Sequence, residues 1–163
     1  KLLYYDGLVQ HAGLLIGPDG TVVHVNQYVP DAHGCYLGRS VRPGNFPSVT
    51  GACLMVKRTV FEEVGGYSAD FAVGYTDADL RCNVRPAGHS VTFTPYAKLY
   101  HNEFVSRGRE EGDPSKMQRW LRERALMQEK WPQFFEQGDP FSNPNLDRDS
   151  LYFALPSPED ARR

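Results

Sequence analysis

Residues 9–25, with the sequence VQHAGLLIGPDGTVVHV, hold the clearest structural signal in the chain. The run from Val9 to Ile16 is largely apolar, and the tetrapeptide GPDG at 17–20 is a strong turn signal. β-Branched residues resume from Thr21 to Val25. Two strand-like runs around a short turn predict a β-hairpin.

Predicted strands and helices alternate on both sides of this hairpin. Residues 1–5 resemble the end of a strand whose neighbours are absent, and Gly51 interrupts a strand-like run, as glycines do where a backbone or ligand comes close. We expect strands at 49–56, 89–94 and 97–101, and helices at 60–64, 77–85 and 114–131. This alternation predicts an α/β fold, with too few strands for a complete doubly wound sheet.

Helix starts are marked by three short patterns. The T-x-x-E at 59–62 and the T-x-x-D at 76–79 resemble capping boxes. Asp113 followed by Pro114 is a typical pair for the N-cap and first position of a helix, and Pro132 prevents that helix from continuing.

Composition narrows the function classes. The 163 residues are 40% hydrophobic, which suits one domain with a real core. Eighteen basic and 20 acidic residues give a net charge of −2, which argues against nucleic-acid binding. The three cysteines include no C-x-x-C pair, and the five histidines form no close pair in sequence, so neither a disulfide scaffold nor a histidine-only metal site is indicated. A reducing cytosol is the simplest compartment.

Two long segments lack any periodicity. Residues 26–48 carry several glycines and prolines, and they fit either a substrate-facing loop or a mobile connector. Residues 137–163 hold four prolines and are expected to form an extended tail after a domain spanning 1–136.

The densest polar group is Tyr75-Thr76-Asp77-Ala78-Asp79, at a predicted helix start. Asp77 shares one helix face with the apolar Leu80 and Val84, so it lies where the buried face opens. A carboxylate there is favoured by the helix dipole and suits a general base, although a helix cap explains it equally well. For Asp79 the structural interpretation is preferred.

Three further candidates are a histidine and two arginines. His101 ends a predicted strand, where α/β sheets bind ligands, although a lone histidine is more often structural. Arg107, beside Gly108, could hold a phosphate or belong to a solvated charged loop. Arg124 falls within the apolar arc of the helix at 114–131, where it could snorkel or reach a buried anion. That arc is expected to face the core.

These motifs match a known family in order and spacing, from about Gly7 to Phe153. The chain resembles the C-terminal, acceptor-side half of family 2 inverting glycosyltransferases, which have the GT-A fold. The matching stretches are LYYDGLVQHAG at 3–13, VTGACLMVKR at 49–58, VFEEVGGY at 60–67, DADL at 77–80, YHNE at 100–103, SRG at 106–108 and DPFSNPNL at 139–146.

The resemblance implies a role for each candidate residue. Asp77 would be the base that takes the proton from an acceptor-sugar hydroxyl as it attacks the anomeric carbon with inversion. His101 would be one ligand of a Mn²⁺ or Mg²⁺ ion that stabilises the departing nucleoside diphosphate. Arg107 would help hold the diphosphate, with Arg124 a weaker candidate. The remaining expected substrate contacts are Thr50, Gly51 and Asp79.

The chain also departs from the family pattern. Thr76 stands where the family often has Glu or Asn, and Asn102 stands where many members have a second histidine. The family's Asp-x-Asp motif and uridine-binding strands would precede Lys1. We therefore expect an incomplete Rossmann-like mixed sheet that lacks its nucleotide-binding half, and a chain that is inactive or nearly so by itself.

The implied partners are a nucleotide-sugar donor and a saccharide acceptor, in cell-surface or O-antigen-type glycan synthesis. The longer protein is expected in the cytosol, with peripheral association at the inner membrane face, and an exposed sheet edge would allow this piece to self-associate. Two alternatives stay open: a non-catalytic sugar-binding or interaction module with the same fold, and a metal-dependent hydrolase of nucleotide sugars.

Overall fold

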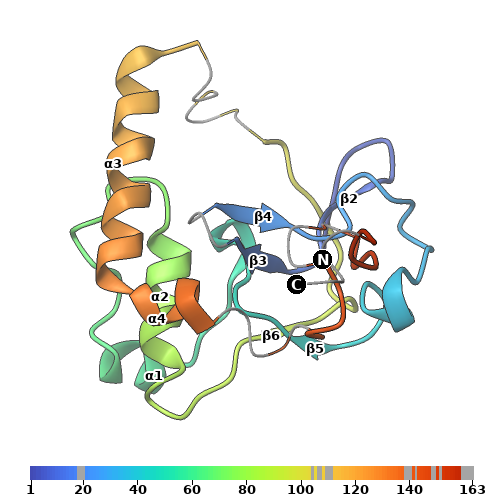
Figure 1. The fold of residues 1–163 in the computed structure, drawn as a ribbon, viewed down its shortest axis with the longest axis horizontal. Coiled ribbons are helices and arrows are strands. Elements are labelled where there is room, and N and C mark those ends of the chain that lie inside the picture. The colour runs from blue at the N-terminus through green and yellow to red at the C-terminus, as the bar shows by residue number, and fades with distance from the viewer. Residues whose placement is uncertain are drawn as a thin grey trace.

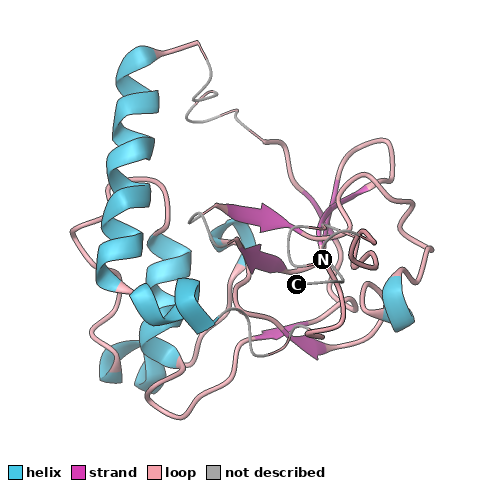
Figure 2. Cartoon of the chain, in the orientation of Figure 1, coloured by secondary structure: helices cyan, strands magenta, loops and turns pink. Residues whose placement is uncertain are grey.

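The computed structural model describes residues 1–17, 21–103, 105, 108, 112–137, 141, 143–147, 150 and 152–158. The fold is mixed α/β, with small β-structures beside a group of helices, as expected for part of a Rossmann-like domain (Figure 1). Figure 2 shows that long loops join these short elements.

Within the described residues, the strands are short and form three small sheets. They are β1 (Leu2–Leu3), β2 (Val9–His11), β3 (Leu14–Ile16), β4 (Val22–His24), β5 (Gly44–Asn45), β6 (Thr92–Phe93) and β7 (Leu99–Tyr100). The first sheet has the order β2-β1-β7, with β1 antiparallel to β2 and parallel to β7. Because β1 and β7 run parallel, Tyr4 and His101 follow them at the same sheet edge. This edge is where α/β proteins bind ligands.

The predicted hairpin is confirmed. Strands β3 and β4 pair antiparallel, with Leu15 opposite Val23 and Ile16 opposite Val22. Strands β5 and β6 form a further antiparallel pair, which Figure 1 shows below β3 and β4.

The strand expected at 49–56 is wrong. The structure has a 3₁₀ turn, η2 (Gly51–Cys53), followed by an irregular segment in which Met55 is 96% exposed. The Oγ1 of Thr50 accepts the backbone N–H of Ala52, and the N–H of Gly51 donates to Asp77. These side-chain bonds replace a strand ladder, as threonine and aspartate often do near turns.

In the described part of the chain, four α-helices lie on the other side of the molecule. They are α1 (Arg58–Glu63), α2 (Thr76–Val84), α3 (Pro114–Lys130) and α4 (Pro132–Gln137), and a further 3₁₀ turn, η1, spans Tyr36–Gly38. The side chain of Asp113 caps α3 as predicted, accepting the N–H groups of Ser115 and Lys116. Pro132 ends α3 as expected but also begins α4, because proline fits the first turn of a helix.

Both predicted capping boxes are wrong. Helix α1 begins at Arg58, so Thr59 lies inside it, with Lys57 as the N-cap residue. The N-cap residue of α2 is Tyr75, which has a left-handed backbone with φ of 61°. Thr76 is therefore the first helical residue rather than the cap.

Two hydrophobic clusters form the core. One joins the sheets and includes Val9, Phe46 and Phe93; Phe153, from the expected extended tail, also packs there. The other joins α2 to α3 through Ala78, Cys82 and Met127. Of the apolar arc expected on α3, Met127 is buried, while Leu121 is half exposed.

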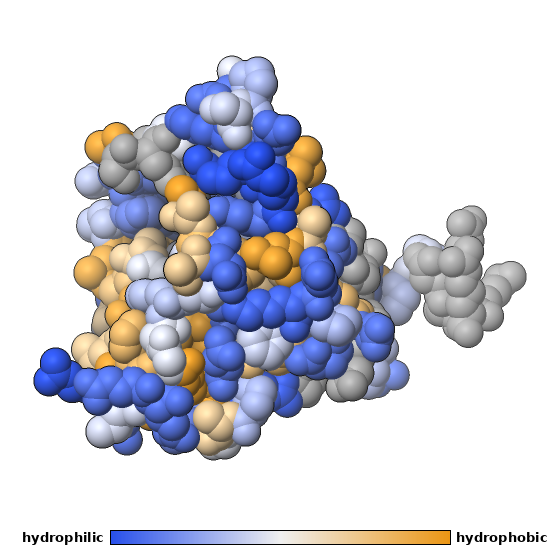
Figure 3. Space-filling model, turned by 90° about the vertical axis from the view of Figure 1, so that its left-hand side faces the viewer, coloured by the Kyte–Doolittle hydropathy of each residue, from blue (hydrophilic) through white to orange (hydrophobic). Residues whose placement is uncertain are grey.

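The surface of the helical side is mostly hydrophilic, with apolar residues scattered among polar ones (Figure 3). Within the described residues, no helix combines the length and apolar character needed to cross a bilayer.

Candidate functional site

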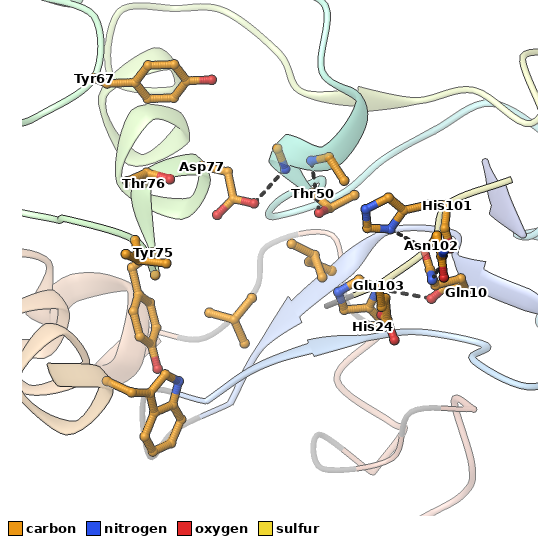
Figure 4. Close-up of a pocket in the computed structure, with 17 residues that line it drawn as sticks. Gln10, His24, Thr50, Tyr67, Tyr75, Thr76, Asp77, His101, Asn102 and Glu103 are labelled. Atoms are coloured by element: carbon orange, nitrogen blue, oxygen red, sulfur yellow. Dashed lines mark hydrogen bonds between the residues drawn. The ribbon is translucent and has the colours of Figure 1, made fainter. Parts of the chain in front are cut away.

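A pocket of about 500 Å³ lies between the helical side and the sheet edge (Figure 4). Its walls come from the η2 turn, residues 73–77 at the start of α2, the β3–β4 hairpin and residues 101–103 after β7. Four of the sequence-predicted residues line it, namely Thr50, Gly51, Asp77 and His101. Segments far apart in sequence therefore meet at one cavity, whose volume suits a small ligand.

Asp77 projects from the first turn of α2 on one side of the pocket (Figure 4). Its Oδ2 accepts the N–H of Gly51 at 2.6 Å, and its Oδ1 accepts the N–H of Ala78 at 2.9 Å. Each carboxylate oxygen has further lone pairs, because a carboxylate accepts about four hydrogen bonds. Asp77 therefore combines the two roles that the sequence left open: it bonds locally at the helix start, and it faces the cavity.

His101 lies on the opposite side of the pocket (Figure 4). Its backbone N–H donates to the carbonyl of Leu3 at 3.1 Å, which extends the β1–β7 pairing by one bond. Its Nδ1 is 2.7 Å from Oε1 of Gln10, and Nε2 of Gln10 donates to the His101 carbonyl at 3.0 Å. One hydrogen bond to the ring and one to the main chain thus hold His101 relative to β2.

Sequence reasoning missed Gln10 and the two histidines beside it. His24 lines the pocket and bonds through Nδ1 to the carbonyl of Gln10 at 3.0 Å, while His11 lies edge-on to it with ring centroids 5.0 Å apart. Burial lowers the pKa of His24 and holds the pKa of His11 well below its ordinary value, so both rings are neutral at pH 7. His11 Nε2 accepts the N–H of Thr50 at 3.3 Å and so holds the start of the η2 turn. One sequence feature could have identified them, because Gln10, His11 and His24 are polar residues inside otherwise strand-like, apolar runs.

Glu123 was also missed, although it shapes the helical wall. This residue of α3 is only 6% exposed. Its Oε1 accepts the N–H groups of Ala72 and Val73 at 2.9 and 3.2 Å, and its Oε2 accepts that of Gly74 at 2.8 Å. A Cβ on Gly74 would lie 2.8 Å from Oε2 of Glu123, so a larger residue here would displace that carboxylate from its hydrogen bonds. The carboxylate thereby fixes the loop that leads into Asp77.

The expectation that Asp79 contacts substrate is corrected by its position. Two residues along an α-helix are separated by about 200°, so Asp79 and Asp77 point in nearly opposite directions. Asp79 is 0% exposed, and its Oδ1 accepts from Nε1 of Trp131 at 2.7 Å and from Nζ of Lys130 at 2.9 Å. It joins α2 to the end of α3, in agreement with the structural interpretation.

Of the two arginine candidates, the structure describes only Arg124. The guanidinium of Arg124 lies 5.6 Å from the ring centroid of Trp120, a residue that lines the pocket, but Arg124 itself does not line it. Arg107 lies outside the described residues.

A metal ion would find few ligands here. His101 and Glu103 line the pocket, but across the described part of the chain no group of three or more His, Cys, Asp or Glu residues could hold a metal ion. His101 and Glu103 could therefore supply only part of the ligand set of a divalent cation, and further ligands would have to come from other residues.

Several known proteins are similar to this chain in sequence. The chain is 41% identical over 159 residues to the uncharacterized protein y4gI of Sinorhizobium fredii, and 34% identical over 147 residues to the O-antigen biosynthesis protein RfbC of Myxococcus xanthus. A third relative, the N-acetylglucosaminyl-diphospho-decaprenol L-rhamnosyltransferase of Mycobacterium tuberculosis, is 32% identical over 62 residues. The chain is thus similar to glycosyltransferase-like proteins.

These similarities cover most of this chain but little of each relative. They include 97% and 90% of the chain for the first two relatives and 38% for the third, yet only 17%, 11% and 20% of the relatives themselves. No family model and no solved structure matches the chain. The relatives therefore associate this segment with glycan-building proteins at a coarse level.

Proposed function

We propose that this chain is the acceptor-side half of an inverting glycosyltransferase of the family 2, GT-A type. It would transfer a sugar from a nucleotide-sugar donor to a saccharide acceptor in cell-surface polysaccharide synthesis. The observation that carries the proposal is Asp77, whose carboxylate faces a pocket of about 500 Å³ opposite His101. The relatives named for O-antigen biosynthesis and rhamnosyl transfer support it.

In this proposal Asp77 acts as the general base. A carboxylate oxygen accepts the proton of an acceptor hydroxyl while that oxygen forms a bond to the anomeric carbon of the donor. The bond from that carbon to the diphosphate breaks on the opposite face, and its electron pair leaves with the nucleoside diphosphate. The Gly51 N–H bond at 2.6 Å holds the carboxylate in place without occupying all its lone pairs.

The other pocket residues would bind and orient the sugars. Thr50 and Gly51 lie beside Asp77 and would contact the acceptor. His101 would be a ligand for Mn²⁺ or Mg²⁺, which when bound neutralises charge on the leaving diphosphate. Arg107 is proposed as a diphosphate contact and Arg124 as a weaker one. The longer protein would work in the cytosol at the inner membrane face, and this half could pair with a second copy through an open sheet edge.

The test compares Asp77→Asn with Asp70→Asn in the longer protein. Asp70 is an exposed carboxylate that bonds Ser68 and Lys130 and lies outside the pocket lining. Nucleotide release from UDP-, GDP- and dTDP-sugars is measured with a saccharide acceptor. We expect Asp77→Asn to lower kcat by about 10²- to 10⁴-fold with donor binding and fold retained, because general-base catalysis contributes on that scale. Asp70→Asn should leave kcat unchanged.

Other outcomes would identify the alternatives. A fully active Asp77→Asn variant would make Asp77 a helix-start residue, and a sugar-binding module would then be the better interpretation. Nucleotide release that does not depend on acceptor would indicate a hydrolase. Transfer by the 163-residue chain alone would contradict the proposal that it is half of a donor-and-acceptor enzyme.

A further inference from the structure

Gln10 connects to both histidines that line the pocket. It is the central residue of β2 and only 1% exposed. Its side chain bonds His101, 91 residues away, and its main-chain carbonyl bonds His24. A buried amide is costly unless its polar atoms are paired, and here both ends are paired to one histidine.

The bonding pattern decides which nitrogen of His101 carries the proton. The His101 carbonyl can only accept, so the Gln10 atom 3.0 Å from it must be the amide NH₂. The other amide atom, Oε1, then faces Nδ1 at 2.7 Å, and an oxygen of this kind also only accepts. Nδ1 must therefore carry a proton, and in the neutral form of the ring Nε2 keeps a lone pair.

The same reasoning applies to His24. Its Nδ1 lies 3.0 Å from the Gln10 carbonyl, which only accepts, so Nδ1 again carries the proton. Burial keeps this ring neutral by lowering its pKa, and Nε2 is left unprotonated. One residue thus sets both pocket histidines to the same tautomer, through its side chain for His101 and through its main chain for His24.

We infer that Gln10 is a positioning residue that presents His24 and His101 to the pocket as Nε2 lone-pair donors. The hydrogen-bond partner of one ring nitrogen commonly fixes the tautomer and orientation of a histidine in this way. With Asp77 and Glu103 on the same lining, the pocket becomes rich in acceptors and suits a ligand with many hydroxyl donors, a saccharide. The identity of that ligand rests on the proposed function, whereas the tautomers do not.

The tautomers can be measured directly. Long-range ¹H–¹⁵N correlation spectra of the ¹⁵N-labelled chain at pH 8, above the ordinary histidine pKa, distinguish protonated from unprotonated ring nitrogens. We expect protonated Nδ1 and unprotonated Nε2 at both His24 and His101. A protonated Nε2 at either ring of the unmodified chain would overturn the inference, and this result needs no variant.

Gln10→Leu tests the role of the amide. Removing Oε1 should move His101 toward the Nε2–H tautomer, which free histidine side chains prefer in water. His24 should not change, because its partner is the main-chain carbonyl of residue 10. The matched control is Gln27→Leu, which removes an amide that bonds Tyr4 instead. An unchanged His101 in a folded Gln10→Leu chain would show that the amide does not set the tautomer.

A second variant covers the case in which Gln10→Leu does not fold. Gln10→Glu keeps an oxygen opposite Nδ1, so Nδ1 of His101 should stay protonated. All spectra are recorded without donor, acceptor or metal, so failure of the proposed transfer reaction would leave them unaltered. Conversely, an Nε2–H tautomer at His101 would leave the Asp77→Asn experiment undisturbed.

Discussion

The two walls of the pocket are held in place by different means. The sheet wall, with His24 and His101, is fixed by the neutral amide and carbonyl of Gln10. The helical wall, with Asp77, is fixed by a carboxylate, since Glu123 of α3 accepts three backbone N–H groups of the preceding loop. In both cases the residue facing the cavity depends on a buried polar residue from a distant part of the sequence. Part of the sheet wall is held by the main-chain carbonyl of Gln10, which a substitution retains, whereas the loop of the helical wall is held by the Glu123 side chain. The helical wall should therefore be the more sensitive to loss of one side chain.

The largest effect is expected from Glu123→Ala. The change leaves the three N–H groups of residues 72–74 without their acceptor, and an unpaired donor costs about 1–3 kcal/mol where it is buried. Because some of these groups would gain water, we expect a loss of about 4 kcal/mol in the free energy of unfolding, measured by urea denaturation. Glu129→Ala, at an exposed position of the same helix, is the control and should cost under about 0.5 kcal/mol. Equal losses in the two variants would mean that Glu123 does not hold the loop.

A smaller loss is expected from Asp79→Ala. It removes the acceptor for Trp131 and one partner of Lys130, and breaking a buried ion pair costs about 3–5 kcal/mol. Lys130 also reaches Asp70, so we expect about 2–3 kcal/mol in the same assay. Asp77→Asn should cost less, about 1 kcal/mol, because it removes one of two acceptor oxygens at a site that is not buried. This contrast separates the two aspartates that the sequence places two positions apart, and a stability loss confined to Asp77→Asn would reverse the assignment.

Acid should weaken the sheet wall first. The folded-state pKa values of His11 and His24 lie below the ordinary value of about 6.5, so the unfolded chain binds more protons. The stability they contribute is present above pH 6.5 and is lost as the pH falls below it. Urea unfolding at several pH values measures the slope of the free energy of unfolding against pH. This slope should be smaller in His11→Gln. An unchanged slope would mean that a group other than His11 causes the pH dependence.

Sequence reasoning succeeded where a signal was local. The hairpin at 9–25 and the Asp113 cap depend on neighbouring residues, and so do the starts of α2 and α3 to within one residue. Four residues named through the family resemblance, Thr50, Gly51, Asp77 and His101, line one pocket, and their roles stay predictions.

It failed where the deciding partner is remote. The run 49–56 has a strand-like composition, but Asp77 captures the Gly51 N–H from 26 positions away and a turn results. Glu123 and Gln10 acquire their roles from residues about 50 and 91 positions distant. No periodicity or motif encodes such pairings, because they arise only when the tertiary structure removes these groups from water.

The smallest effect is expected from Gly51→Ala, where the sequence predicts a close approach. The structure has room, because a Cβ on Gly51 would lie 3.4 Å from Cβ and Oδ2 of Asp77, in ordinary van der Waals contact. The bond to Asp77 uses the main-chain N–H, which alanine retains. We expect a change of less than about 0.5 kcal/mol in urea denaturation, in contrast to Gly74→Ala, where the new Cβ would lie 2.8 Å from Oε2 of Glu123 and overpacking costs about 1–3 kcal/mol. If Gly51→Ala proved the more damaging of the two, the η2 turn rather than the Glu123 loop would be the tightly fitted part of the helical wall.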